Sequence, residues 1–559
     1  MMRRFLWLEM TFILIILVSV FLLSGVSRAE ENLQQYVENM EPGWNLGNTL
    51  DAPEGETTWG NPRTKKELIE KVADSGFNSI RIPVTWDKRI GSGPEYRIND
   101  DFMERVEQIV DWALEEDLYV ILNMHHDSDW IKEMGNDYDK VLNRYSAVWE
   151  QIAEHFRDYP ETVMFEAINE PRFSDAGLEQ QDRPEYFVFL DDLQQTFHKI
   201  VRDSGATNET RPLVLTTMTG SSRENRIDEL AETISELDDD RLIATFHFYG
   251  YWPFSVNVDG KTRFDERVKQ DIVENFERGY EIFVQEGIPV IIGEFGLLGF
   301  DKSVSVIEHG EMLKFFEYAT YYADKLGMPL MLWDNGQHLD RRSLQWRDKQ
   351  LLNLVIAGTK NRSSYAENDF VFIKEGEEIT DEKLKLKLHG NELVDVKAGE
   401  ESLVQGTDFK LQDELLIIKA EYLKEVINDE YGVNETLVLE FSQGIDWKID
   451  LIYYAPPEVK GEVKGSRKVY LPLKFRGDRL ATMEAEYLDR SGNPGIHDWT
   501  PYLEFDREFK IKEGTVILSS DLTDNMKDGK ILLTLHFWSG DRIEYILQKE
   551  GNDYEGKLK

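Results

Sequence analysis

The sequence predicts an α/β fold, a (β/α)8 TIM barrel, followed by two small all-β sandwich modules. The first reason is length, because 559 residues suffice for about two to four domains of ordinary size. The second is a pattern from about Gly43 to Trp333, where short apolar runs alternate with longer amphipathic stretches. The third is a change of pattern near Asn361, after which short alternating strands follow one another with few helical segments.

The first expected element is a signal peptide at residues 1–29. Arg3 and Arg4 form a positively charged start, residues 11–23 are a mainly apolar run, and residues 27–29 (Ser-Arg-Ala) offer a cleavage site. The apolar run is shorter than the roughly 20 residues that a membrane-spanning helix needs. We therefore expect a secreted, extracellular bacterial protein that has no membrane contact once the signal peptide is cleaved.

The barrel is expected at residues 30–360, because eight βα units fit into about 300 residues there. A doubly wound sheet lacks support, since no G-x-G-x-x-G pattern follows the first strand. Helices with apolar residues at spacings of three and four are expected between the strands, for example at 65–75, 101–116 and 268–285. The eight expected strands lie at 43–48, 78–84, 119–125, 163–169, 213–217, 242–249, 289–295 and 328–333.

The rest of the chain is expected to form two β-sandwich modules of about 100 residues each, at 361–457 and 458–559. Residues 384–388 (Leu-Lys-Leu-Lys-Leu) show the alternation of apolar and polar side chains that is typical of a half-buried strand. Residues 455–458 (Ala-Pro-Pro-Glu) suit a stiff linker between the modules. The sequence shows no internal repeat.

Composition excludes several classes of function. The chain has 64 basic and 106 acidic side chains, and a net charge of −42 disfavours binding to nucleic acid. It has no cysteine, which excludes a disulfide scaffold, a thiol nucleophile and a Cys-ligated metal. Nothing in the sequence marks an oligomer, and we expect a monomer.

Two glutamates follow buried strands at positions where a barrel enzyme carries its active site. Glu170 lies in Asn-Glu-Pro after the fourth expected strand, and Glu294 lies in Gly-Glu-Phe-Gly at the end of the seventh. A pair of carboxyl groups across a barrel mouth is what hydrolysis of a glycosidic bond needs. Glu166, inside the fourth strand, is expected to be a buried, paired structural carboxylate.

Further polar and aromatic residues fall at strand ends: Asn48, Arg81, His125, His126, Asn169, His247, Tyr249 and Trp333. With the two glutamates, this ordered set resembles glycoside hydrolase family 5 of clan A, specifically its endoglucanase-like members. The start of the barrel, residues 43–50 (Gly-Trp-Asn-Leu-Gly-Asn-Thr-Leu), resembles a subgroup of cellulases, lichenases and xyloglucan-active enzymes. The resemblance covers roughly residues 35–355.

The resemblance implies a retaining double displacement that needs no cofactor. Glu170 would be the general acid/base, its pKa raised by the nearby anionic nucleophile. Glu294 would be the nucleophile, kept ionised by Arg81 and Tyr249, and the two carboxyl groups would lie about 5 to 5.5 Å apart. The remaining residues would bind the sugar or tune the carboxylates: Asn169 at the 2-hydroxyl, Trp333 as a stacking face, and His125, His126, His247 and Asn48 as polar contacts.

We expect no metal. His125, His126 and Asp127 resemble a metal cluster, but adjacent residues on a strand point to opposite faces, so both histidines could hardly bind one ion. The sequence also contains no complete D-x-D-x-D-G calcium loop.

The chain has 13 tryptophans, which divide by context. Trp112 and Trp149 lie in helical segments and are expected in the core. Tryptophans just past strand ends or in long loops are candidates to line a cleft, where flat rings stack on sugars: Trp86, Trp130, Trp252 and Trp346.

The two C-terminal modules resemble known companions of bacterial cellulases. Residues from about 366 to 456 resemble an Ig-like module, for which a spacer role is favoured over a sugar-binding surface. The final segment resembles a family 46 carbohydrate-binding module, in which Trp499 and Trp538 are the candidate glycan-binding residues.

Together these observations predict a secreted endo-β-1,4-glucanase that acts on cellulose-like or mixed-linkage β-glucan and on xyloglucan. A mannanase is an alternative, since related barrels keep both glutamates and change only the loops around the cleft. A non-catalytic glycan-binding scaffold is disfavoured because Arg81, Tyr249 and both glutamates are present.

Overall fold

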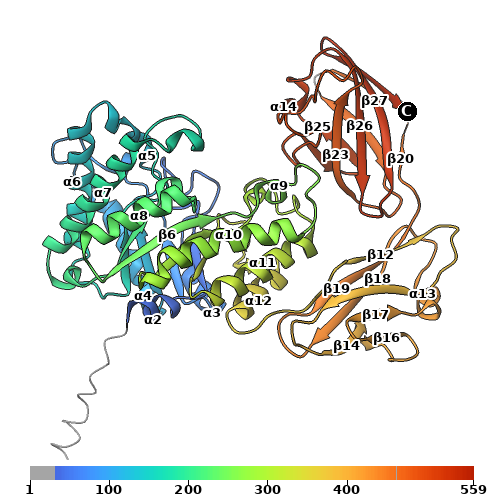
Figure 1. Ribbon diagram of the computed structural model, residues 1–559, viewed down its shortest axis with the longest axis horizontal. Coiled ribbons are helices and arrows are strands. Elements are labelled where there is room, and N and C mark those ends of the chain that lie inside the picture. The colour runs from blue at the N-terminus through green and yellow to red at the C-terminus, as the bar shows by residue number, and fades with distance from the viewer. Residues whose placement is uncertain (1–31, 461–462, 467) are drawn as a thin grey trace, which may run out of the picture.

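The computed structural model describes residues 32–460, 463–466 and 468–559. The expected signal peptide lies outside these residues. Figure 1 shows a barrel surrounded by helices and, beside it, two β-rich modules. Within the described ranges, no helix combines the length and the apolar character needed to cross a bilayer.

Eight parallel strands close into a barrel in chain order, which confirms the predicted TIM barrel. Strand β1 pairs with β2 on one side and with β8 on the other, so the sheet has no free edge. The strands are β1 (Gly43–Leu46), β2 (Ser79–Ile82), β3 (Tyr119–Asn123), β4 (Val163–Glu166), β5 (Leu213–Thr216), β6 (Leu242–Phe248), β7 (Val290–Phe295) and β8 (Leu330–Asp334).

Amphipathic helices cover the outside of the barrel. In α4, for example, Val106, Ile109 and Val110 are buried at the expected spacing, and the Asn99 side chain caps the helix by accepting from the amide of Phe102 at 3.0 Å. The main helices of the barrel are α3 (Lys66–Asp74), α4 (Asp100–Glu115), α6 (Tyr138–His155), α7 (Pro184–Asp203), α8 (Glu224–Leu237), α10 (Glu266–Ile282), α11 (His309–Lys325) and α12 (Lys349–Gly358).

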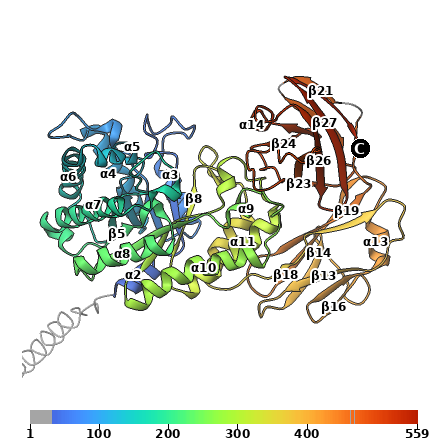
Figure 2. The same ribbon diagram turned by 45° about the horizontal axis from the view of Figure 1, so that its top comes forward.

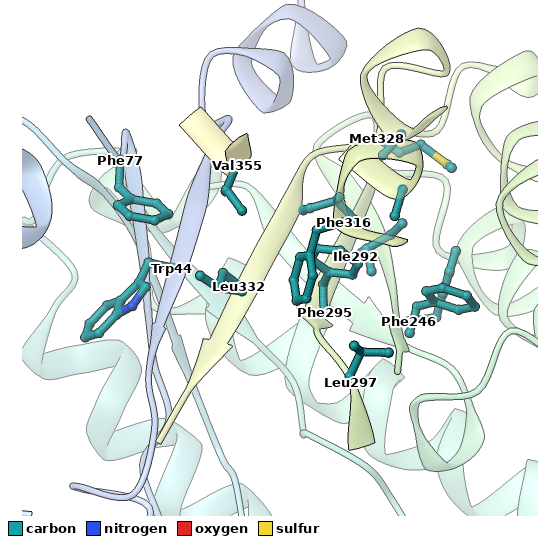
Figure 3. Packing of buried hydrophobic residues seen from close by; sticks show 14 of the residues in the cluster. Trp44, Phe77, Phe246, Ile292, Phe295, Leu297, Phe316, Met328, Leu332 and Val355 are labelled. Atoms are coloured by element: carbon teal, nitrogen blue, oxygen red, sulfur yellow. The ribbon is translucent and has the colours of Figure 1, made fainter. Parts of the chain in front are cut away.

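The barrel has one core inside and another between strands and helices. The short helix α2 (Leu33–Glu38) packs against the interior layer, to which strands β3 to β8 contribute Ile121, Met164, Val214, Ile243, Ile291 and Met331. In the outer core, Phe295 of β7 meets Phe316 of α11 edge to face at 5.1 Å between ring centroids (Figure 3). The opposite end of the barrel from α2 is left for the loops that follow the strands.

Each C-terminal module consists of a four-stranded and a five-stranded sheet. The middle module contains β11 (Tyr365–Ala366), β12 (Phe370–Lys374), β13 (Glu382–Lys387), β14 (Leu393–Ala398), β15 (Glu401–Ser402), β16 (Phe409–Gln412), β17 (Leu415–Ile418), α13 (Ala420–Val426), β18 (Gly432–Phe441) and β19 (Trp447–Tyr454). The C-terminal module contains β20 (Glu458–Val459), β21 (Val463–Ser466), β22 (Val469–Lys474), β23 (Leu480–Tyr487), β24 (Phe509–Lys512), β25 (Thr515–Leu518), α14 (Ser520–Thr523), β26 (Gly529–Phe537), β27 (Arg542–Glu550) and β28 (Asp553–Leu558).

The two modules have nearly the same topology, contrary to the expectation of no internal repeat. Their four-stranded sheets run β11-β13-β17-β16 and β20-β22-β25-β24, and their five-stranded sheets differ by one inserted and one missing strand. Phe409 and Phe509 occupy matching positions, since each begins the hairpin and is buried. Lys410 and Ile417 also match Lys510 and Ile517, which pair at the same position of the two hairpins.

The modules meet the barrel differently. The buried hydrophobic residues of the middle module form one continuous cluster with those of the barrel, whereas the C-terminal module has a core of its own. At the first junction, Lys314 of α11 donates to Asp369 Oδ2 at 3.2 Å, and Trp447 Nε1 donates to Asp369 Oδ1 at 2.7 Å. Figures 1 and 2 show the C-terminal module beside the helix α9 (Trp252–Ser255), which follows β6.

Candidate active site

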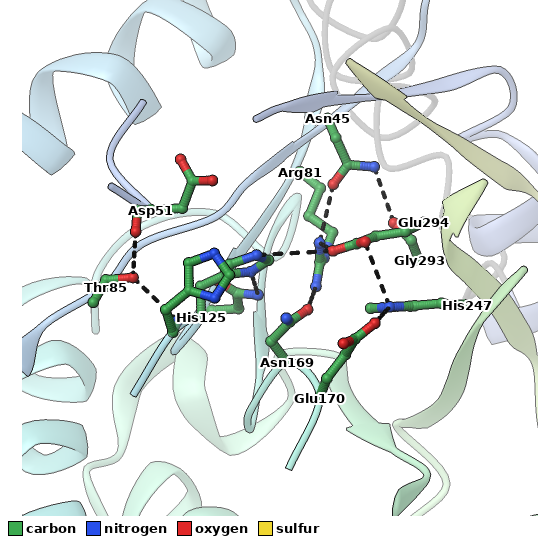
Figure 4. Close-up of polar contacts among 12 residues, drawn as sticks. Asn45, Asp51, Arg81, Thr85, His125, Asn169, Glu170, His247, Gly293 and Glu294 are labelled. Carbon is green, nitrogen blue, oxygen red and sulfur yellow. Dashed lines mark hydrogen bonds and ion pairs between the residues drawn. The ribbon is translucent and has the colours of Figure 1, made fainter. Parts of the chain in front are cut away.

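A cavity of about 440 Å³ lies where the strands of the barrel end. It collects side chains from loops and strand ends that are far apart in the sequence, as expected for a barrel enzyme. Eight of the predicted site residues line it: Asn48, His125, His126, Asn169, Glu170, Tyr249, Glu294 and Trp333. Arg81 and His247 are buried and bonded to these residues (Figure 4).

Arg81 is the buried centre of the polar network. Its guanidinium donates two hydrogen bonds to Glu166, at 2.6 and 2.7 Å, one to Glu294 at 2.9 Å and one to Asn169 Oδ1 at 2.7 Å. Burial disfavours the charge, but the two carboxylates outweigh that effect and raise the pKa of Arg81. Glu166 is buried and paired, as the sequence predicts, and it offsets the charge of Arg81.

Glu294 accepts hydrogen bonds on both of its oxygens. Arg81 Nη1 donates to Oε1, and the Tyr249 hydroxyl donates to Oε2 at 2.6 Å. A β-bulge at Gly293 shifts the register between β6 and β7, which places Glu294 opposite His247. A Cβ at Gly293 would lie 2.7 Å from Thr245 Oγ1, so a side chain at this position would disturb the bulge.

Glu170 shares a hydrogen bond of 2.9 Å with His247 Nδ1. Burial disfavours protonation of His247, but the charge of Glu294 and the bond to Glu170 outweigh it and raise the pKa of His247. Burial also favours protonation of Glu170, but His247, Arg172 and His126 outweigh it and lower the pKa of Glu170. The lowered pKa of Glu170 runs against the expected rise, because His247, Arg172 and His126 favour the charged form of Glu170 more than burial disfavours it.

The two glutamates face each other at short range. One oxygen of Glu170, one oxygen of Glu294 and a ring nitrogen of His247 all lie within 4.8 Å of one another. His247 Nδ1 lies 3.6 Å from Glu294 Oε2, so the imidazole sits between the two carboxylates. The three groups can hold and move a proton within one small space.

His125 and His126 both line the cavity, which corrects the expectation that they point to opposite faces. Strand β3 ends at Asn123, and the histidines lie in the turn beyond it, so the alternation of a strand does not apply. Their rings lie edge to face at 4.4 Å, and His125 stacks on Trp333 at 5.9 Å between centroids. Burial lowers the pKa of both histidines, which keeps His125 neutral.

Three groups of side chains bring potential metal ligands within 4.8 Å of one another in the described residues. One is the pair of glutamates with His247, and another is Asp51 with His125 and His126. Both oxygens of Asp51 already accept from the backbone amides of Asn48 and Thr49. The third group joins Glu308, Glu311 and Asp369 at the junction with the middle module, where Lys314 already supplies a positive charge.

Four further residues line the cavity that sequence reasoning did not assign to the site: Trp59, Leu298, Asp301 and Asn335. Trp59 lies in the loop after β1 and contacts His126 edge to face at 5.4 Å. Leu298 and Asp301 belong to the short helix after β7. Their positions after the ends of strands could have indicated a place at the cavity. Loop residues, however, show no periodic pattern that identifies which of them face it.

Trp130 does not line the cavity, which corrects its assignment as a substrate-binding residue. Its Nε1 donates to Asp127 Oδ1 at 2.8 Å, and Arg144 covers the ring at 4.3 Å from its centroid. Trp86 and Trp346, which were candidates to line the cleft, are also buried. Trp86 Nε1 donates to the carbonyl of Asn123 at 3.0 Å, and Trp346 Nε1 donates to Ser75 Oγ at 2.8 Å.

The two tryptophans of the C-terminal module lie in different places. Trp499 is 54% exposed and lies beside Trp252, with 6.1 Å between ring centroids. Trp538 lies at the junction of the three modules, where Arg263 covers its ring and Phe370 packs against its edge. The ring of Trp538 therefore packs against residues of both other modules.

Family models match three parts of the chain. Residues 45–339 match the model of cellulase, glycosyl hydrolase family 5. Residues 366–451 match carbohydrate binding domain X2, and residues 457–557 match the carbohydrate binding domain of family 46. Carbohydrate-binding domains beside such a barrel imply a polysaccharide substrate.

Relatives of known name match along nearly the whole chain. Endoglucanase B of Paenibacillus lautus is 44% identical over 530 residues, which are 94% of this chain and 93% of the relative. The full-length tri-modular endo-β-1,4-glucanase B of Bacillus halodurans is 46% identical, with a TM-score of 0.92 over 94% of this chain and 99% of that structure. A tri-modular subfamily 4 endo-β-1,4-glucanase of Bacillus licheniformis is 32% identical, with a TM-score of 0.79 and coverage of 94% and 99%.

Proposed function

Because the chain belongs to the cellulase family of glycosyl hydrolases, family 5, we propose that it cleaves internal β-1,4-glucosidic bonds by a retaining double displacement. It is an enzyme of the endo-β-1,4-glucanase class, as its relatives over nearly the full length are. The observation that carries the proposed mechanism is the separation of Glu170 and Glu294, with one oxygen of each within 4.8 Å. Retaining enzymes hold their carboxyl groups about 5 to 5.5 Å apart, and inverting enzymes about 6.5 to 9.5 Å.

In the first step, Glu294 attacks the anomeric carbon. Arg81 and Tyr249 hold its two oxygens in place. The bond to the leaving sugar breaks, and Glu170 protonates the departing oxygen. We assign that proton to the pair of Glu170 and His247, which share one hydrogen bond at 2.9 Å and whose pKa values move in opposite directions.

In the second step, Glu170 acts as a base. It takes a proton from a water molecule, which attacks the anomeric carbon and releases Glu294. While Glu294 is esterified, its negative charge is gone, and so is its tendency to hold a proton on His247. The pair of Glu170 and His247 therefore gives up a proton in the first step and takes one up in the second.

The sugar at the cleavage point is bound by the residues around the pair. Arg81 donates to Asn169 Oδ1, which leaves the amide nitrogen of Asn169 as the donor toward a sugar hydroxyl. Trp333 offers a flat face that is held by its stacking on His125. Asn48 and His126 line the same cavity and supply polar contacts.

Cellulose-like chains, mixed-linkage β-glucan and xyloglucan are the proposed substrates. Trp252 and Trp499 form a second aromatic surface where the C-terminal module meets the barrel, and we assign to it contact with a long glucan chain. The middle module acts as a support. An extracellular location of the monomeric enzyme fits a substrate too large to enter a cell.

The test is the release of reducing sugar from carboxymethylcellulose, barley β-glucan, xyloglucan and mannan by the wild type and by Glu294→Gln. The proposal expects activity on glucans that disappears in the variant. Activity on mannan alone would keep the mechanism and replace the substrate. Equal activity in the variant would contradict the assignment of Glu294.

A further inference from the structure

The C-terminal module is hydrogen-bonded to two loops of the barrel, one after β6 and one after β7. Asn257, in the loop after β6, donates from Nδ2 to the carbonyl of Val306 at 3.0 Å and to the carbonyl of Ala481 at 3.1 Å. The hydroxyl of Thr500 donates to Asp259 Oδ1 at 2.8 Å. These bonds tie the module to the segments that follow the strands of His247 and Glu294.

Glu504 is the buried carboxylate at this interface. Its side chain is 2% exposed, and its Oε1 accepts from Lys302 Nζ, in the loop after β7, at 2.6 Å. Its Oε2 accepts from His497 at 2.9 Å and from Arg507 at 3.1 Å. Burial disfavours ionisation of Glu504, but Lys302, His497 and Arg507 outweigh it and lower its pKa, so the group stays charged.

The loop that Lys302 belongs to also reaches the catalytic cavity. Leu298 and Asp301 line that cavity, and Asp301 Oδ1 accepts from Asn335 Nδ2 at 3.3 Å. Asp301 is exposed to solvent at the cavity, and desolvation by its neighbours, together with the charges of Glu294 and Glu170, raises its pKa to about 6. Asp301 is thus a third carboxylate at the cleft, and the mechanism above does not use it.

Glu504 also contacts, through His497, the aromatic rings at this interface. The ring of His497, which donates to Glu504, packs edge to face on Trp252 at 5.1 Å between centroids. One carboxylate therefore links the loop of Asp301 with the rings of Trp252 and Trp499. A shift of the Lys302 contact would move the loop that lines the cavity, and a shift of the His497 contact would move the aromatic surface.

We propose that Glu504 is a positioning residue through which the C-terminal module places Asp301 and Leu298 in the catalytic cavity, where Asp301 accepts hydrogen bonds from hydroxyl groups of the glucan. The inference rests on the proposed glucanase function, since it names a substrate contact of the same site. Carboxylate acceptors make stronger hydrogen bonds than neutral ones, and sugar hydroxyls are their natural donors.

Kinetics on cellohexaose test the proposal with Lys302→Met, Glu504→Gln, the double variant and Asp301→Asn. Each single variant is expected to raise KM about 3- to 10-fold with kcat within about twofold, because the lost contact binds substrate and transition state alike. The double variant should be no worse than the more affected single variant, because both act on one contact. Lys374→Met is the matched control, since it breaks an ion pair of 3.7 Å with Asp541 between the two β-modules.

Hydrogen exchange of residues 298–306 gives a readout that does not depend on activity. Faster exchange is expected in Lys302→Met and Glu504→Gln and not in Lys374→Met. If Glu504→Gln does not fold, Lys302→Met decides, because its side chain is 40% exposed. If the wild type is active and the variants show its KM, or if they show its hydrogen exchange, the inference is overturned. A wild type that cleaves no glucan would instead refute the proposed function, and exchange would still test the positioning.

Discussion

Two regions near the ends of the barrel strands are built in different ways. On the barrel side, Arg81, Glu166 and Glu294 are buried and joined by hydrogen bonds of 2.6 to 2.9 Å. On the side of the C-terminal module, Trp252 and Trp499 are 37% and 54% exposed and meet at 6.1 Å. The comparison shows a buried, hydrogen-bonded network among the barrel strands and an exposed aromatic surface where the C-terminal module meets the barrel.

The largest expected effect lies on the barrel side, in Glu294→Gln and Glu170→Gln. Loss of the nucleophile should lower kcat about 10⁴-fold or more on glucans and on dinitrophenyl cellobioside alike. Loss of the acid should lower kcat about 10³-fold on glucans but far less on the activated aryl glycoside, whose leaving group needs no proton. If the aryl glycoside rescued Glu294→Gln and not Glu170→Gln, Glu170 would be the nucleophile and Glu294 the general acid.

The second prediction concerns pH and the pair of Glu170 and His247. The pKa of His247 is raised above its ordinary value of 6.5, so the pair should lose its shared proton only above pH 6.5. Activity should fall as the pH rises through this raised pKa. In His247→Asn the proton is held by Glu170 without its partner, and the alkaline limb of kcat/KM should move to lower pH by about one unit. An unmoved alkaline limb would show that His247 does not share the catalytic proton.

The third prediction concerns the module side and is smaller. Trp499→Ala should reduce kcat/KM on barley β-glucan about 5-fold, because one stacking face is lost, and should change hydrolysis of cellotriose less. Tyr470→Ala is the matched control, since Tyr470 of β22 is 51% exposed in the same module. Equal effects of the two variants would contradict the role of Trp499.

The smallest effect on activity is expected at the junction of the barrel with the middle module. Lys314→Met leaves the buried Asp369 without its cation and should lower the free energy of unfolding by about 3 to 5 kcal/mol. Activity at low temperature should stay within twofold of wild type. Thermal unfolding and β-glucan hydrolysis measured on the same samples would separate the two effects, and a parallel loss of activity would give the middle module a part in the cleft.

The strands of the barrel and the residues at their ends could be predicted from the sequence, because a buried parallel strand is a short apolar run whose end is marked by polar residues. Glu170, Glu294 and Arg81 are found in this way. Loop residues could not be predicted, because their positions depend on contacts between distant segments. Trp59 in one loop lines the cavity whereas Trp130 in another packs beneath it, and the packing of Trp538 against Arg263 depends on how three modules meet.

The opposite pKa shifts of Glu170 and His247 also escaped prediction. The sequence places Glu170 near an anionic partner, which alone would raise its pKa, but it does not show the imidazole at 2.9 Å. Only the bulge at Gly293 and the loop after β4 bring the three groups together. The electrostatics of a site follow from its geometry more than from its list of residues.

The stereochemistry of the first product tests the central claim most directly. Proton NMR during early hydrolysis of cellohexaose would show which anomer is released before mutarotation. The account predicts the β-anomer, because Glu170 and Glu294 lie within 4.8 Å and leave no room for a water between them. Initial release of the α-anomer would mean inversion and would contradict Glu294 as the nucleophile.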